Sequence, residues 1–241
     1  GPLTGVAPVD PLAITAQFDG EQARDQSFRM IVHPTLGGET LRVRLSNLVG
    51  TQPVRFEPLR VALRAAGPAI VPGSDTAVLF NGQPGVTIAP GAEAISDPVA
   101  LSYAYGDDLA VSFHVVGDSG PMTWHAVSFG LNYVSTPDNG DITADPTGAQ
   151  FGQASTGWFF LSGIDVQAPD AGAIVALGDS ITDGAYEKPW VFRPKDLVSW
   201  WSNAHVERVG GIEWLDIRVG ELRQLFNAMD PAPADPALLT G

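Results

Sequence analysis

The chain has 241 residues, including 27 Gly and 20 Pro but no Cys, and carries a formal net charge of −14. The negative charge argues against nucleic acid or an anionic membrane as a partner, since both are bound through basic patches. The lack of Cys excludes a disulfide framework, a thiol nucleophile and a thiolate metal site.

The first residues, GPLTGVAPVD, do not form a signal peptide, and Gly1 and Pro2 are typical of a scar left by tag cleavage. No apolar run in the sequence is long enough to span a bilayer. We therefore expect a soluble protein with no membrane partner. The compartment stays open, and a secreted or periplasmic location would require that a native leader has been removed.

Short alternating stretches dominate the sequence up to about residue 168, and turn residues fill nearly every gap between them. The clearest are SFRMIVH (27–33), TLRVRLSN (40–47), RVALRAA (60–66) and DLAVSFHVV (108–116). Regularly spaced strands without a helical period predict a mainly β protein. The expected first domain is an antiparallel, jelly-roll-like β-sandwich over residues 12–168.

The sequence changes character in its last third, and we expect residues 169–241 to form a second region. Ala173–Leu177 is apolar on both faces, which predicts a strand buried in a parallel α/β sheet. No Lys occurs before residue 187, whereas both lysines and four of the six Trp follow residue 186. Apolar residues then recur at helical spacing from Leu215 to Met229, which predicts a helical tail.

The stretch GAIVALGDSITDG resembles block I of the GDSL (SGNH) hydrolases, in which a GDS turn follows the first strand. Upstream stretches such as IVHPTLGGETLRVRLSN and MTWHAVSFGLNYVS are similar to the N-terminal sandwich of a bacterial branch of that family. The resemblance covers roughly residues 12–184. It implies that residues 169–184 begin an α/β catalytic unit.

The resemblance implies that Ser180 is the nucleophile of a serine esterase. In the turn 178–184, Gly178 and Gly184 let the backbone turn tightly, and Asp179 or Ser180 can cap the next helix. The Ser180 amide is a natural oxyanion donor. His205 is the single histidine after Ser180 and is the default general base.

The family's downstream motifs, G-x-N-D and D-x-x-H, do not occur in residues 185–241. We therefore expect weak hydrolysis of carboxylic esters, with small esters or acylated carbohydrates as substrates and no resident cofactor. We also expect the apolar stripe of the tail to fold back on the sandwich or to pair with a second chain in a homodimer.

Two other hypotheses stay open. The first is a non-catalytic, carbohydrate-binding-like sandwich that stacks sugar rings on exposed aromatic residues such as Trp124, Tyr103 and Tyr105. The second is a metal-dependent hydrolase that uses sandwich histidines, with His33 and His125 as candidate ligands and a nearby carboxylate such as Asp107, Asp108 or Asp118.

Overall fold

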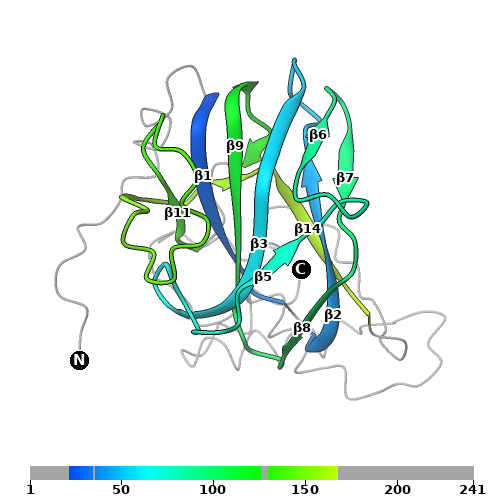
Figure 1. Cartoon of the computed structure of the whole chain (residues 1–241), viewed down its shortest axis with the longest axis vertical. Helices are drawn as coiled ribbons and strands as arrows, with labels where there is room; N and C mark the ends of the chain where they lie inside the picture. The colour runs from blue at the N-terminus through cyan, green and yellow to red at the C-terminus, as the bar shows by residue number, and fades with distance from the viewer. Residues whose placement is uncertain (1–21, 35, 126–129, 168–241) are drawn as a thin grey trace, which may run out of the picture. The chain divides into compact units, whose positions relative to one another are not determined.

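The computed structural model describes residues 22–34, 36–125 and 130–167, which all belong to the first of two units into which the chain divides at residue 171. These residues form strands and no helix, so the expected mainly β character is confirmed (Figure 1). The expected strand at 173–177, the turn at 178–184 and the helical tail lie outside the described residues. Within the described ranges, no helix is long and apolar enough to cross a membrane.

The larger sheet has eight strands in the order β12-β11-β1-β9-β3-β4, with β5 and β6 also paired to β3. All its pairings are antiparallel, and the long strands β1, β9 and β3 form its centre (Figure 1). The strands are β1 (Gln22–Val32), β3 (Val54–Ala66), β4 (Ala69–Ile70), β5 (Thr76–Val78), β6 (Val86–Ile88), β9 (Leu109–Pro121), β11 (Asn132–Val134) and β12 (Gln153–Ser155).

A second antiparallel sheet of four strands is built around β2, which pairs with β14, β7 and β8. Its strands are β2 (Gly38–Ser46), β7 (Glu93–Ile95), β8 (Val99–Tyr103) and β14 (Leu161–Val166). A separate two-stranded ribbon joins β10 (Trp124–His125) to β13 (Trp158–Phe159). The four clearest stretches predicted from the sequence therefore fall on β1, β2, β3 and β9. The shortest strands have too few residues to show the alternation of apolar and polar side chains.

One hydrophobic core takes side chains from both sheets. Because side chains alternate along a strand, Phe28 on β1 and Phe113 on β9 point to the same face and stack with ring centroids 5.4 Å apart. The ring of Phe160, which lies between β13 and β14, packs edge-on against Phe56 at 5.1 Å. Burial of these rings away from water supplies much of the driving force that holds the two sheets together.

The opposite face of β1 is also buried, although it is polar. Ser27 and Arg29 are fully buried, and the segment between β11 and β12 covers them. We call this segment, residues 135–152, the docked loop. Its Ile142 and Phe151 form a small apolar cluster with Tyr133 of β11. The larger sheet is therefore covered on both faces along β1.

Candidate functional site

Ser180, His205, Asp179, Gly178 and Gly184 lie outside the described residues, so their roles stay predictions. The structure does describe both candidate metal ligands, His33 and His125, and the three candidate sugar-stacking residues. It also reveals two buried polar networks and the pairing of Trp158 with His125, which the sequence did not indicate.

His33 lies just after β1 and is oriented by a carboxylate. Its Nδ1 is 2.7 Å from Oδ1 of Asp108, whose Oδ2 accepts a hydrogen bond from Nη1 of Arg64 at 2.8 Å. Sheet order explains the contact, because Val32 and Leu63 both pair with Leu109 on the central strand β9. A carboxylate can only accept, so Nδ1 carries the proton in this pair.

The second ring nitrogen of His33, Nε2, is buried and has no hydrogen-bond partner among the described residues. A carboxylate that orients an imidazole in this way is found in both hydrolytic triads and metal sites. Of the three carboxylates that the sequence offered, Asp107, Asp108 and Asp118, the structure places Asp108 against His33. Among the described residues, no group forms a hydrogen bond with Nε2 that would complete such a site.

His125 lies on the ribbon, whereas His33 follows a strand of the larger sheet. His125 is exposed, and its cross-strand neighbour is Trp158. In the described part of the chain, no group of three or more His, Cys, Asp or Glu side chains could hold a metal ion. The metal hypothesis therefore stays a prediction that needs ligands from elsewhere in the chain.

A serine, a histidine and an aspartate meet on the outer face of the larger sheet. The Oγ of Ser27 is 3.2 Å from Nδ1 of His114, and Nε2 of His114 is 3.2 Å from Oδ1 of Asp25. Ser27 is fully buried, and its hydroxyl donates its single proton to the carbonyl oxygen of Gly140 at 2.9 Å. The Ser27 Oγ in turn accepts a hydrogen bond from the backbone N–H of Ile142. This serine fastens the docked loop to the sheet, and its proton is committed to that role.

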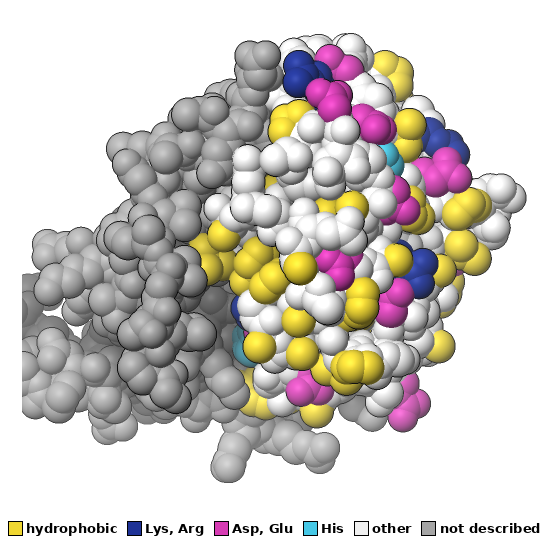
Figure 2. Space-filling view, turned by 60° about the vertical axis from the view of Figure 1, so that its left-hand side comes forward, with side chains coloured by type: hydrophobic (Ala, Val, Ile, Leu, Met, Phe, Trp, Pro, Cys, Tyr) yellow, Lys and Arg dark blue, Asp and Glu magenta, His cyan; other side chains and the backbone are white. Residues whose placement is uncertain are grey.

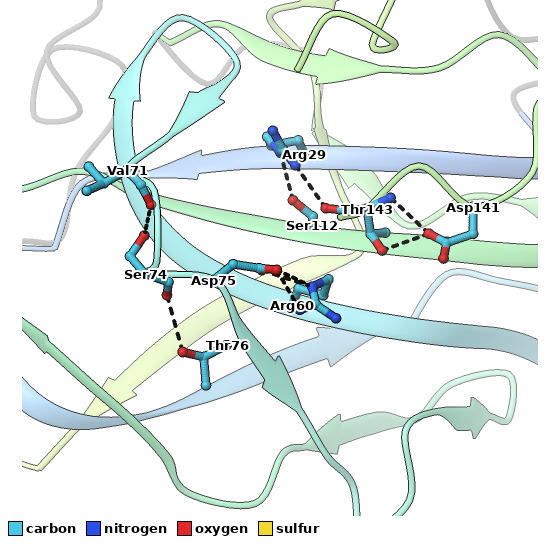
Figure 3. A network of polar contacts seen from close by, with 9 residues as sticks. All are labelled: Arg29, Arg60, Val71, Ser74, Asp75, Thr76, Ser112, Asp141 and Thr143. Carbon is cyan, nitrogen blue, oxygen red and sulfur yellow. Dashed lines mark hydrogen bonds and ion pairs between the residues drawn. The ribbon is translucent and has the colours of Figure 1, made fainter. Parts of the chain in front are cut away.

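Arg29 anchors the docked loop at a second point (Figure 3). Its Nε donates to Ser112 Oγ at 2.8 Å, and its Nη2 donates to the carbonyl oxygen of Thr143 at 2.9 Å. Nη1 donates to the carbonyl oxygen of Pro68, and the Phe151 ring lies 4.5 Å from the guanidinium carbon. Burial lowers the pKa of Arg29, against the raising effects of two nearby aspartates. These three hydrogen bonds all go to groups of the protein itself, which marks a structural role.

The ribbon of β10 and β13 has one cross-strand pair on each face, and both of its Trp side chains are partly buried against the core. Trp124 is directly opposite Phe159, and their rings stack at 6.1 Å as part of the packing against the core. His125 is directly opposite Trp158, so these two side chains share the other face. The indole N–H of Trp158 donates to the carbonyl oxygen of Leu161, which holds the ring in place.

The three aromatic residues expected to stack on sugars lie in different environments. Tyr103 is only 6% exposed, and burial raises the pKa of its hydroxyl. Trp124 packs against the core, while Tyr105 is 48% exposed. Sequence reasoning missed Trp158, although its position opposite the outward His125 would have followed from a correct pairing of the two short strands.

Comparison with protein families gives one match, to the GTA TIM-barrel-like domain over residues 155–217. No GDSL (SGNH) family matches, so the resemblance stated above is wrong. The physical reason is that a buried apolar strand followed by a Gly- and Asp-containing turn is common to many folds with parallel strands, TIM barrels included. Ala173–Leu177 and the turn after it are therefore not specific to one family.

The match covers about a quarter of the chain, and a complete TIM barrel needs about 250 residues. Its described portion, residues 155–167, contains β13 and β14, which pair antiparallel with β10 and β2. This portion therefore matches the family in sequence, but its strands lack the parallel pairing of a TIM barrel. A search of curated proteins finds no match to the chain.

Proposed function

We propose that the described region is a jelly-roll-like β-sandwich that acts as a non-catalytic, carbohydrate-binding-like module. The observation that carries this proposal is the cross-strand pair of Trp158, which is partly buried, and His125, which is exposed, on one face of the ribbon. Aromatic rings held rigidly at a surface bind ligands with little loss of side-chain entropy. The hydrogen bond from Trp158 to Leu161 supplies that rigidity here.

The test is a binding screen with the full chain. Soluble oligosaccharides of several compositions, neutral and acidic, are titrated into the protein, and heat of binding and Trp fluorescence are recorded. We expect at least one oligosaccharide to bind with a saturable isotherm. A complete lack of binding across the set would contradict the module.

Ester hydrolysis by Ser180 is the second candidate function, and its support is the residue pattern of residues 171–184. An apolar run is followed directly by a turn that carries Gly178, Ser180 and Gly184, which suits a serine exposed at the end of a strand. His205 would serve as the base. Small esters or acylated carbohydrates would be the substrates.

An assay with p-nitrophenyl acetate distinguishes the candidates. For Ser180 chemistry we expect slow turnover in the unmodified chain that survives a chelator and disappears in Ser180→Ala. His205→Ala should lose nearly as much activity as Ser180→Ala, because residues that act as a unit do not contribute additively. Equal rates in the unmodified chain and Ser180→Ala would exclude this candidate. Activity that a chelator removes would instead favour the metal-dependent hydrolase.

A further inference from the structure

The exposed part of the Trp158 side chain is hydrocarbon. Its one polar group, the indole N–H, is already bonded to the carbonyl oxygen of Leu161, and the side chain is partly buried against the core. The part of the ring that solvent reaches is therefore apolar, and the hydrogen bond fixes its orientation. A flat face made of C–H groups suits such a surface, because it can be buried without leaving a polar group unpaired.

His125 supplies the polar counterpart. It is exposed and directly opposite Trp158, and in antiparallel strands the Cβ atoms of opposite residues are about 5 Å apart. A neutral imidazole has one donor and one acceptor nitrogen, so it can hydrogen-bond a hydroxyl group in either role. The pair thus combines a stacking surface with a hydroxyl-binding group within the dimensions of one sugar ring.

The net negative charge of the chain disfavours acidic sugars as ligands. The chain carries a net charge of −14, and residues 1–186 contain no Lys. Acidic side chains are spread over the face shown in Figure 2, with fewer basic ones among them. A sugar that carries a carboxylate or sulfate would be repelled by this field, whereas a neutral sugar would not.

We propose that His125 and Trp158 form a subsite for one neutral pyranose residue, with the ring stacked on Trp158 and a hydroxyl bonded to His125. This inference rests on the binding function proposed above, and it adds the residues and the ligand class. It is independent of any chemistry at Ser180.

The experiment uses the full chain in a Ser180→Ala background, so that no ester is consumed. Cellohexaose and mannohexaose serve as neutral probes and hexagalacturonate as the acidic one, all followed by isothermal titration calorimetry. The variants are Trp158→Ala, Trp158→Phe and His125→Ala, with the inward-facing Trp124→Phe as the matched control. Far-UV circular dichroism and a melting curve confirm that each variant is folded.

We expect a neutral hexaose to bind and hexagalacturonate not to. Trp158→Ala should weaken binding by about tenfold or more, and His125→Ala by about threefold to tenfold, since one is a stacking contact and the other a neutral hydrogen bond. Trp158→Phe, which keeps a ring, should lose less than Trp158→Ala. Trp124→Phe should stay within about twofold.

The failures can be told apart. Binding of a neutral hexaose that His125→Ala and Trp158→Ala leave unchanged would overturn this subsite but not the binding function. Binding of hexagalacturonate alone would overturn the choice of neutral sugars. No binding of any probe would overturn both the subsite and the module.

Discussion

Arg29 shows how a polar residue on a strand becomes part of a protein interior. A buried cation is costly unless its donors are satisfied, and here three backbone or hydroxyl oxygens and one aromatic ring surround the guanidinium. The oxygens come from β9, the turn after β3 and the docked loop. One side chain therefore fastens three segments that are distant in sequence.

Replacing Arg29 with Met should destabilise the protein strongly. The carbonyl oxygens of Pro68 and Thr143 would lose a buried donor, and each such loss costs about 1–3 kcal/mol. We expect a total of about 3 kcal/mol or more in the free energy of unfolding, measured by urea denaturation.

Arg24→Ala is the matched control for this prediction. Arg24 forms an exposed ion pair with Asp138 at 3.1 Å, and such pairs contribute about 0–1 kcal/mol. Similar losses in the two variants would show that the buried network does not stabilise the fold.

At the scale of elements, the docked loop is held along its whole length. Near its start, the backbone of the loop forms a hydrogen bond with the backbone of Asp25, in the bulged part of β1. Further on, it forms a hydrogen bond with the backbone of Ile70 on β4. Within the loop, burial acts to raise the pKa of Asp145, but hydrogen bonds from Gln150, Thr147 and Gly148 outweigh it and lower that pKa. The ionised carboxylate thus closes the loop's own turn.

Gly148 should be the position of the docked loop least tolerant of a side chain. Its φ is +69°, and an added Cβ would lie 2.7 Å from the carbonyl oxygen of Pro68. We expect Gly148→Ala to cost about 1–3 kcal/mol more than Gly91→Ala in thermal or urea unfolding. Gly91 has a similar φ of +71° but open space around it, so its variant reports the backbone cost alone. Equal costs would mean that the loop is not tightly packed against Pro68.

At the scale of the whole molecule, the two sheets share one core, and the acidic surface follows from a strong excess of Asp and Glu over Arg.

The apolar stripe expected in the tail leads to a prediction about assembly. We propose that the full chain forms a homodimer, because an amphipathic helix needs a surface against its apolar face. Light scattering should give twice the chain mass, and a strict monomer at high concentration would exclude the dimer.

Part of the fold could be predicted from the sequence because it depends on local properties. Alternation in SFRMIVH and DLAVSFHVV predicts strands, since side chains on a strand point to opposite faces in turn. Family assignment failed because its strongest motif was a short strand-and-turn pattern that several folds share. The catalytic candidates fall outside the described residues, so they stay predictions.

What the amino-acid sequence determined by itself is therefore the mainly β character, the positions of the long strands and the negative charge. Only the tertiary structure decided that Arg29 is buried, that His33 meets Asp108 and that His125 faces Trp158. Alternation alone would have placed Arg29 in solvent. The physical reason is that strand order and register, which join residues distant in sequence, are selected by the packing of the whole core rather than by any local pattern.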